Sequence, residues 1–237
     1  MSTRVHRLCT WSGIAMAVLT AIGAVLIGRF IPPFMSPTDT ATVVAERYAE
    51  HANRVRLGAI VSALGLTLIV PFGAEIAART RRLESSRPVL TYIQVASIAI
   101  ASVFVVLTCT IWALTAFRPT QYPPEIVRYS NDLAYFLFIF TWPPFTVWFL
   151  AVAAAALREH PRPAFPRWSG YLSIWLAVQI AAGSLIPFFT TGPFAYNGLF
   201  ALYLPVALFF AWVVAMTVVL HRGEPTEASE GSLPGLA

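Results

Sequence analysis

Hydrophobic and polar residues divide the chain into long apolar stretches separated by short charged segments. Six apolar stretches lie at about residues 8–30, 57–78, 89–117, 133–157, 168–189 and 196–220. The fourth holds 25 consecutive uncharged residues, from Leu133 to Leu157, with Pro143 and Pro144 near its centre. A helix needs about 20 residues to cross about 30 Å of hydrocarbon. The pattern therefore predicts six membrane-spanning helices, the fourth broken at its proline pair.

The apolar stretches are continuous and lack the alternation of polar and apolar residues that is typical of strands in a membrane barrel. Inside lipid the backbone has to satisfy its own hydrogen bonds, and a helix does so within one segment. We therefore predict an all-α, polytopic membrane protein, with a single six-transmembrane-helix bundle over residues 1–222. Residues 223–237 have the polar composition of a disordered tail, which we expect in the cytoplasm.

A polar segment between the first two stretches has helical periodicity. Residues 36–39 (SPTD) resemble a capping box, with a serine at the N-cap and a proline at the first helical position. Apolar residues then recur at steps of three and four: Ala41, Val44, Tyr48, Ala52 and Val55. The pattern predicts a short external amphipathic helix from about Pro37 to Asn53, either a connector along the membrane interface or a lid over an opening.

The loops on the two sides of the predicted bundle differ in charge. All 16 basic residues are arginines, and six spans place ten of them on one side: Arg4, Arg7, Arg79, Arg81, Arg82, Arg87, Arg158, Arg162, Arg167 and Arg222. The side richer in arginine faces the cytoplasm in membrane proteins. We therefore predict a multi-pass protein with both its N- and C-termini in the cytoplasm.

The composition agrees with a membrane protein and limits the kinds of partner that we expect. The chain is 57% hydrophobic and 11% charged, whereas soluble domains are about 45–50% apolar and about 25% charged. A net charge of +5 suggests nucleic-acid binding in a soluble protein, but here the arginines lie in short loops between apolar stretches. We expect the lipid bilayer as the main partner and no nucleic acid.

Residue types that carry metal or redox chemistry are sparse. The histidines lie singly outside the apolar stretches, and the two cysteines, Cys9 and Cys109, have no partner spacing. Haem and di-iron sites need several histidines at helical or short spacing. The chain also has no P-loop and no GxGxxG motif. We therefore expect no metal and no cofactor, and the pattern leans against an enzyme without deciding the question.

Glu75 is the acidic residue that lies clearly inside an apolar stretch. An ionisable group within a membrane segment is a functional candidate by default, for example as a proton site. Arg79 follows four residues later, so an ion pair near the membrane boundary accounts for the same residue without any function. Both interpretations stay open at this stage.

Other polar residues gather where the spans end on the side poorer in arginine. Arg29 ends the first span, and Arg118 ends the third. Asn131 and Asp132 open the fourth span, and Tyr135 follows one turn later. These residues either line a pocket, with Asp132 paired to an arginine, or belong to an aromatic belt whose charges reach water.

The proline pair is a further candidate for contact with a ligand. Pro143 and Pro144 remove the amide donors that normally serve the carbonyls of Ile139 and Phe140. Freed acceptors near the middle of a membrane have to find a side chain, water or a ligand. Helices that are broken near the middle of the membrane are typical of bundles that handle ligands.

Three motifs carry a resemblance to known proteins: RFIPPF after the first apolar stretch, FPRWSGYLSIW at the start of the fifth, and FFTTGPFAYNG between the fifth and sixth. Through them the chain resembles a group of small six-helix bacterial inner-membrane proteins of unassigned function. The resemblance covers most of the chain and implies a bacterial cytoplasmic (inner) membrane location. It implies no activity and no site residue.

Three functional hypotheses follow from these patterns. The first is that the bundle binds or transports a small, largely apolar molecule in a cavity near the proline-broken helices. The second is a non-catalytic subunit or scaffold, packed against a partner membrane protein or a second copy of the chain. The third is an intramembrane enzyme that uses Glu75 or Asp132 as a general acid or base. The ligand-site candidates are Glu75, Asp132, Asn131, Arg29, Arg118, Tyr135, Pro143 and Pro144.

Overall fold

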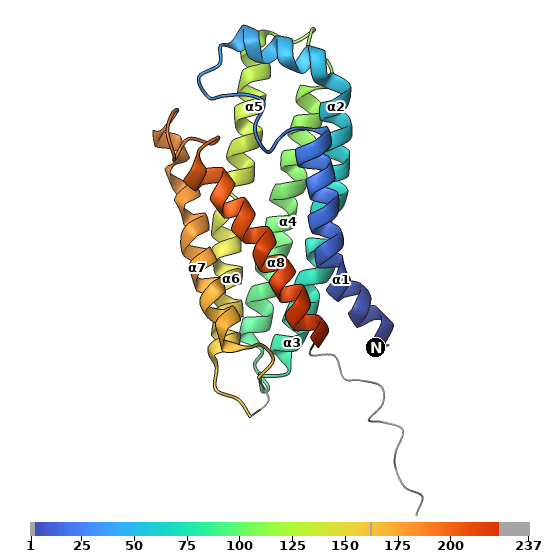
Figure 1. Cartoon of the computed structure of the whole chain (residues 1–237), viewed down its shortest axis with the longest axis vertical. Helices are drawn as coiled ribbons and strands as arrows, with labels where there is room; N and C mark the ends of the chain where they lie inside the picture. The colour runs from blue at the N-terminus through green and yellow to red at the C-terminus, as the bar shows by residue number, and fades with distance from the viewer. Residues whose placement is uncertain (1–2, 162, 223–237) are drawn as a thin grey trace, which may run out of the picture.

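The computed structural model describes residues 3–161 and 163–222, and within them every regular element is a helix. Six helical units in this part of the chain are long and apolar enough to cross a membrane: Arg4–Ile27, Ala41–Arg81, Val89–Thr115, Pro124–Leu157, Arg167–Phe188 and Leu199–Arg222. The prediction of an all-α, six-helix membrane bundle is therefore confirmed (Figure 1). The predicted tail, residues 223–237, lies outside the described residues.

The six units run up and down, so the connecting loops gather at the two ends of the bundle (Figure 1). One end, which we call the arginine-rich end, holds the two described termini and residues 82–88, 158–161 and 163–166. The other, which we call the distal end, holds residues 28–40, 116–123 and 189–198. The separation of the loops agrees with the six spans expected from the sequence.

Two units contain π-helical turns. In the first unit, α1 (Thr3–Thr20) continues directly as the π-helix η1 (Ala21–Ile27). In the last unit, the π-helix η3 (Leu199–Tyr203) leads directly into α8 (Leu204–Arg222). Both π-helices lie towards the distal end. Short π-helical turns within α-helices occur frequently at functional sites.

Two other units are α-helices broken near a proline. In the second unit, α2 (Ala41–Thr67) stops at Leu68 and α3 (Ile69–Arg81) carries Pro71 in its first turn. In the fourth unit, α5 (Pro124–Ile139) gives way to α6 (Trp142–Leu157), which begins with the proline pair. The predicted break in the fourth span is thus present, because a proline has no amide hydrogen to donate and clashes with the preceding turn.

The remaining two units are simpler. The third unit is the single helix α4 (Val89–Thr115). The fifth consists of α7 (Arg167–Ile180) followed by the 3₁₀ helix η2 (Ala181–Phe188). Gly183 of η2 packs against the α5–α6 break, where a Cβ atom would lie 2.6 Å from Ile139 Cγ2 and 3.3 Å from the Ile139 carbonyl oxygen. The absence of a side chain at Gly183 therefore lets η2 approach the break.

The start predicted for the amphipathic helix is wrong by four residues. The helix begins at Ala41 rather than Pro37, because the Thr40 hydroxyl caps it. Thr40 Oγ1 accepts a hydrogen bond from the Val43 amide at 3.4 Å. The preceding segment forms a turn, in which the Asp39 carboxylate accepts from the Ser36 amide at 2.9 Å. Threonine is a good N-cap residue, so the cap lies later than the proline pattern indicated.

This amphipathic segment is also the first part of α2 and not a separate helix. The backbone departs from helical geometry at His51, with φ −109° and ψ 15°. Because of this kink, the first part of α2 crosses the distal end of the bundle before the helix turns along it (Figure 1). Val44 and Tyr48 are fully buried on its inner face, so the predicted apolar face packs on the bundle.

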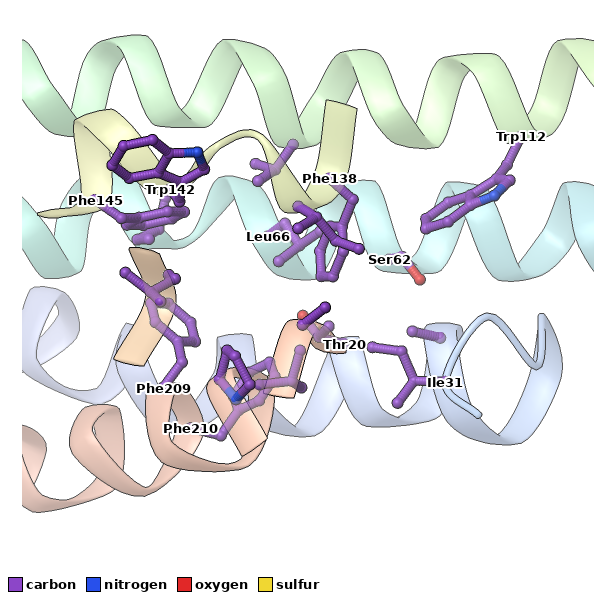
Figure 2. Close-up of a pocket in the computed structure, with 18 residues that line it drawn as sticks. Thr20, Ile31, Ser62, Leu66, Trp112, Phe138, Trp142, Phe145, Phe209 and Phe210 are labelled. Carbon is purple, nitrogen blue, oxygen red and sulfur yellow. The ribbon is translucent and has the colours of Figure 1, made fainter. Parts of the chain in front are cut away.

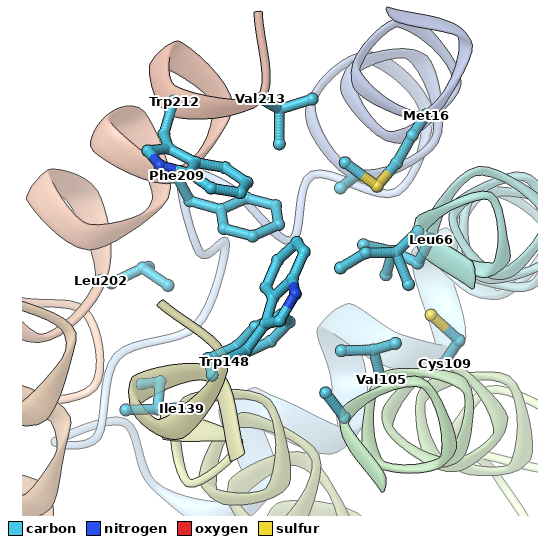
Figure 3. Packing of buried hydrophobic residues seen from close by; sticks show 14 of the residues in the cluster. Met16, Leu66, Val105, Cys109, Ile139, Trp148, Leu202, Phe209, Trp212 and Val213 are labelled. Carbon is cyan, nitrogen blue, oxygen red and sulfur yellow. The ribbon is translucent and has the colours of Figure 1, made fainter. Parts of the chain in front are cut away.

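Aromatic side chains fill the centre of the bundle on the side of the arginine-rich end. The Trp148 and Trp212 rings meet edge to face, with centroids 5.0 Å apart, and Phe149 meets Trp212 at the same distance. All three side chains are fully buried. Figure 3 shows Trp148 and Trp212 reaching the middle of the bundle from α6 and α8. Aromatic pairs of this geometry stabilise a core beyond their buried area.

Small residues bring the first two units into close contact. A Cβ atom at Gly58 would lie 2.4 Å from the Gly28 Cα atom, and one at Gly23 would lie 2.5 Å from the Ser62 amide. Such distances leave no room for a side chain. Small residues at helix interfaces in membranes let backbones approach this closely. The crossing of α2 with α1 and η1 forms one wall of the cavity.

Candidate ligand cavity

An apolar cavity of about 70 Å³ lies within the bundle, and all six membrane-crossing units contribute to its lining. Figure 2 shows it as an elongated space that extends from Trp112 at one end to Phe145 and Phe209 at the other. A volume of this size exceeds what one water molecule needs. The cavity is smaller than the about 150 Å³ apolar cavity known to bind benzene, so it is narrow for a ring.

The cavity lies where the irregular points of the helices meet. Leu66 and Ile69 line it on either side of the break between α2 and α3. Ile139 and Trp142 line it on either side of the break between α5 and α6. The two π-helices each contribute an alanine to the lining: Ala24 and Ala201. Two helix breaks and two π-helices thus border the same space.

The chain reverses sharply after η1 and closes the distal end of the cavity. Arg29 takes a left-handed conformation with φ 54°, and the Phe30 amide donates back to the Ala24 carbonyl at 2.7 Å. The turn directs the Phe30 ring into the bundle, where it stacks on Trp112 with centroids 4.0 Å apart. Gly28 permits this turn, since a Cβ atom there would lie 2.5 Å from the Phe30 ring.

A buried polar network lies above this aromatic stack. The Tyr48 hydroxyl donates to Asn131 Oδ1 at 2.9 Å, and Asn131 Nδ2 lies 3.3 Å from both the Tyr196 hydroxyl and Asp132 Oδ1. The Tyr135 ring stacks on Tyr196 with centroids 4.7 Å apart. Burial, and then the nearby Asp132 carboxylate, raise the pKa of Tyr196, which therefore stays protonated. The network joins α2, α5 and the 189–198 loop.

The other end of the cavity is closed by the aromatic core. Phe145 and Phe209 line the cavity there, and their rings meet edge to face with centroids 5.3 Å apart. Behind them lie Trp148 and Trp212, both fully buried. The Trp212 indole donates to the Ser173 hydroxyl at 2.9 Å, which fixes its orientation. The packed rings separate the cavity from the arginine-rich end.

Buried polar atoms without a hydrogen-bond partner concentrate at the cavity. Among the described residues there are seven such side-chain atoms, and four belong to the lining: Thr20 Oγ1, Ser62 Oγ, Trp112 Nε1 and Trp142 Nε1. Thr20, Ser62 and Trp112 are only 4%, 1% and 2% exposed. Leaving a buried polar group unsatisfied costs about 1–3 kcal/mol. Four residues that line the cavity therefore carry polar atoms that are buried and have no hydrogen bond within the described residues.

The predicted site residues at the distal end fall into two groups. Asn131 and Tyr135 are fully buried and lie beside the cavity's distal closure, where the Tyr135 hydroxyl donates to the Phe30 carbonyl at 3.1 Å. Asp132 joins them through the Asn131 amide. Arg29 and Arg118 are exposed, and the Arg118 guanidinium lies over the ring of its neighbour Phe117 at 4.8 Å. The structure thus does not bring these two arginines into the buried network.

Pro143 and Pro144 shape the cavity without lining it. Pro143 is exposed and Pro144 is half-buried at the start of α6. Their neighbours Trp142 and Phe145 provide the contacts with the cavity. The proline pair therefore positions the lining residues by breaking the helix, in place of the direct contact that the sequence suggested.

Glu75 lies far from this cavity, in a charged cluster at the arginine-rich end. The Arg79 Nε atom lies 3.2 Å from Glu75 Oε1, and His6 Nδ1 lies 2.6 Å from Glu75 Oε2. Arg79 also donates to the Leu220 carbonyl of α8. The predicted pair of Glu75 with Arg79 is present. The placement of the histidines outside the spans is wrong for His6, His51 and His221, which lie within membrane-crossing units. Of these, His6 lies in α1 and joins this cluster.

Sequence reasoning missed the residues that give the cavity its polar atoms. Thr20 and Ser62 lie within the small-residue stretches that build the α1–α2 crossing, and Trp112 and Trp142 lie within long apolar runs. A hydroxyl or an indole in a membrane helix is common. The available signal was that Thr20 and Ser62 each lie three residues before a glycine, Gly23 and Gly65, which indicates a close helix contact but not a cavity.

Known proteins do not provide an assignment for this arrangement. No protein family matches the chain, and neither the curated proteins nor the solved structures include a match to it. Among the described residues, no group of three or more histidine, cysteine, aspartate or glutamate side chains is placed to hold a metal ion. The interpretation of the site therefore rests on its geometry.

Proposed function

We propose that this integral membrane protein binds a small, largely apolar molecule in the cavity between its six helical units. The observation that carries the proposal is the convergence of two π-helices and two helix breaks on one apolar space. Irregular turns weaken helices and are retained mostly where they serve a function. Ligand sites in helical bundles are typically apolar spaces between helices with a few polar atoms.

The closure of the cavity favours holding a molecule over passing it across the membrane. The Phe30–Trp112 stack covers its distal side, and the packed rings of Trp148 and Trp212 lie on its other side. The half-buried lining residues Val206 and Phe210 lie on the surface of α8. A ligand therefore enters from the lipid beside α8, where an apolar molecule is already dissolved.

Mass spectrometry of small molecules retained by the purified protein tests this function. Ala201→Leu places a larger side chain in the cavity lining, because Ala201 is only 3% exposed and faces that space. Ala211→Leu makes the same change at an exposed position nearby in the same unit. We expect the retained molecule to fall to background in Ala201→Leu and to persist in Ala211→Leu.

Two outcomes would overturn the proposed function. The first is a wild-type protein that retains no molecule above the level found with an unrelated membrane protein in the same detergent. The second is equal retention by the two leucine variants, with both folded. Thermal unfolding of each variant in the same detergent shows whether the protein is folded, so that loss of ligand is separated from loss of structure.

We further propose that the arginine-rich end faces the cytoplasm of a bacterial cell, with the protein in the inner membrane. The excess of arginine in the loops at that end supports this orientation. Ser85 and Thr120 are exposed in loops at opposite ends of the bundle. In a variant without Cys9 and Cys109, a membrane-impermeant thiol reagent added to intact cells should label Thr120→Cys and not Ser85→Cys. The reverse pattern would invert the orientation.

A partner membrane protein is a second candidate role, and the exposure of α7 favours it. The unit that contains α7 is the least covered by the rest of the bundle. In its 18-residue apolar stretch 28% of the residues are buried, against 39% or 44% in the other units. Trp168, Tyr171 and Trp175 are exposed along it. Replacing Tyr171 and Trp175 by leucine should release a second copy or a bound subunit in mild detergent, measured as native mass. An unchanged native mass would exclude α7 as the contact.

A further inference from the structure

A second, smaller pocket lies at the distal end of the bundle, apart from the apolar cavity. Its volume is about 40 Å³, which exceeds what one water molecule needs. The two spaces share no lining residue. We call the smaller one the arginine pocket, because two of its lining residues carry guanidinium groups. Its lining consists of Ile27, Gly28, Arg29, Phe34, His51 and Arg54.

The close crossing of the first two helical units brings the two arginines together. A Cβ atom at Gly58 would lie 2.4 Å from the Gly28 Cα atom, so the backbones touch there. Arg29 directly follows Gly28 in the chain. Arg54 lies one helical turn before Gly58, on the same face of α2. The backbone contact therefore places two cationic side chains at one pocket.

Contacts of the loop after η1 fix the shape of the pocket. Arg47 Nη1 donates to the Phe34 carbonyl at 2.8 Å and lies 2.9 Å from an Asp39 carboxylate oxygen. The Phe34 ring meets the His51 ring edge to face, with centroids 6.3 Å apart. Arg29 has a φ of 54°, a conformation that glycine adopts more readily than arginine. Residues held against their backbone preference gather at ligand sites.

The two guanidinium groups of the pocket have no counter-charge among the described residues. Neither Arg29 nor Arg54 forms an ion pair there, and the Arg29 side chain has no hydrogen bond either. Arg54 Nη2 donates to the Leu26 carbonyl at 3.5 Å, which leaves its other donors unused. The exposed Glu50 carboxylate lies 4.0 Å from His51 Nε2. The pocket therefore offers positive charge and N–H donors to an anion.

An exposed apolar surface begins beside the arginine pocket. The first membrane-crossing unit ends at Ile27, directly before the turn that carries Arg29. Leu26 is exposed at the end of that unit, and Leu57 is exposed on α2, three residues after Arg54. Exposed leucines in membrane-crossing helices face the acyl chains of the bilayer. The pocket thus lies at the depth where a lipid headgroup meets its chains.

We propose that the arginine pocket binds a phosphate group, whose oxygens accept hydrogen bonds from the Arg29 and Arg54 guanidinium groups. The planar fork of arginine can donate two parallel bonds to a phosphate. The small volume suits one phosphate group, so the remainder of any larger molecule lies outside the pocket. An anionic phospholipid and free phosphate share this chemistry. The site is separate from the apolar cavity and does not depend on the function proposed for it.

Three probes distinguish the sources of the phosphate. Dioleoyl phosphatidylglycerol carries the phosphate and two chains, dioleoylglycerol carries the chains alone, and inorganic phosphate carries the group alone. Each is titrated against the purified full-length protein in detergent at constant ionic strength. Binding is measured as the rise in unfolding temperature, because a ligand of the folded state stabilises it. We expect phosphatidylglycerol to act at the lowest concentration, since its chains contact the exposed leucines, and dioleoylglycerol to have no effect.

Inorganic phosphate should raise the unfolding temperature only at higher concentration. If it acts at the same concentration as phosphatidylglycerol, the site takes free phosphate and the chains add nothing. Both results support a phosphate site and assign its ligand to one source or the other. Sodium chloride at the same ionic strength is the control, because an effect of salt alone would not depend on a phosphate group.

Variants assign the binding to the named side chains. Arg29→Gln and Arg54→Gln should each weaken phosphatidylglycerol binding about three- to tenfold, as one charge-assisted contact at an exposed site provides. The Arg29 side chain has no bond to the described residues, so Arg29→Gln breaks no contact of the fold. Arg118→Gln is the matched control, because Arg118 is exposed at the same end and does not line the pocket. It should bind as the wild type does.

Three outcomes would overturn the phosphate site. The first is an unfolding temperature that neither phosphatidylglycerol nor inorganic phosphate raises above the salt control. The second is equal stabilisation by phosphatidylglycerol and dioleoylglycerol, since the chains alone then account for binding. The third is an equal loss of binding in Arg118→Gln and in the two pocket variants, because binding then follows the total charge of the distal end. Retention of an apolar molecule in the cavity is tested separately by Ala201→Leu.

Discussion

The charged cluster at the arginine-rich end and the cavity inside the bundle differ in how their buried polar groups are bonded. At the arginine-rich end, the Glu75 carboxylate is held by His6 at 2.6 Å and by Arg79 at 3.2 Å, and Arg79 reaches the Leu220 carbonyl. These contacts join α1, α3 and α8. At the cavity, by contrast, the hydroxyls and indole nitrogens of the lining have no partner. The first arrangement fixes helices to one another, whereas the second leaves buried polar atoms without a hydrogen bond within the described residues.

This difference shows that a polar residue in a membrane helix is informative mainly through its partners. Glu75 was the strongest functional candidate by residue type, since ionisable groups in membranes are costly. Its bonds are complete within the protein, which is the arrangement of a structural cluster. Thr20 and Ser62 are ordinary residues by type, yet their buried hydroxyls have no hydrogen bond within the described residues.

Breaking the charged cluster should cause the largest loss of stability. Arg79→Gln leaves the Glu75 carboxylate, which is 4% exposed, with His6 as its remaining charged partner. Removing one partner of a buried ion pair costs about 3–5 kcal/mol. The free energy of unfolding, measured by denaturant titration in detergent, should fall accordingly. Arg82→Gln, at the exposed arginine that follows α3, is the matched control and should change little.

If Arg79→Gln unfolds as the wild type does, the charged cluster does not contribute to the free energy of unfolding. The double variant Glu75→Gln with Arg79→Gln sharpens the test, because it removes both charges together. We expect the double variant to be more stable than Arg79→Gln alone, since no unpaired charge remains buried. Additive losses from the two substitutions would contradict a direct interaction.

Separating the first two helical units should damage the cavity wall and the fold together. Gly58→Leu places a side chain where even a Cβ atom would lie 2.4 Å from the Gly28 Cα atom. Overpacking of this kind costs about 1–3 kcal/mol. The thermal unfolding temperature should fall, whereas Ala74→Leu, at an exposed position of α3, should leave it unchanged. Equal temperatures for the two variants would refute the close crossing.

Removing one hydroxyl from the distal network should have a moderate effect. Tyr48→Phe deletes the bond of 2.9 Å to Asn131 Oδ1 inside a fully buried site. The unsatisfied acceptor should lower the free energy of unfolding by about 1–2 kcal/mol. Tyr129→Phe, at a side chain that is 66% exposed, is the control. If both variants unfold at the wild-type denaturant concentration, the network does not stabilise the distal end.

The smallest effect should be a pH dependence of the loop before α4. Slight burial raises the pKa of Glu84, but its hydrogen bonds with Leu90 and Thr91, with the charge of Arg158, lower it overall. The carboxylate therefore stabilises the folded state above the ordinary pKa of a glutamate, and this contribution is lost as pH falls through the lowered value. Glu84→Gln should flatten the acid side of the stability profile, and Glu159→Gln should not.

A great deal of the fold follows from local pattern. The six apolar stretches predict six spans because a helix is the segment that satisfies its own backbone in lipid, and six helical units of the described residues are long and apolar enough to cross a membrane. The break before Pro143 is predicted for the same kind of reason, since a proline removes a donor in any surrounding. These properties depend on the chain within a few residues.

Only the tertiary structure determines which residues line the cavity. The two π-helices, at 21–27 and 199–203, have no signature in the apolar pattern, because Ala, Leu and Phe favour no single helix type there. Thr20 and Trp112 are about ninety residues apart, and only packing places both beside one space. A sequence read on its own specifies which residues can cross a membrane. It does not specify which of their polar atoms find a partner, because that depends on how six helices meet.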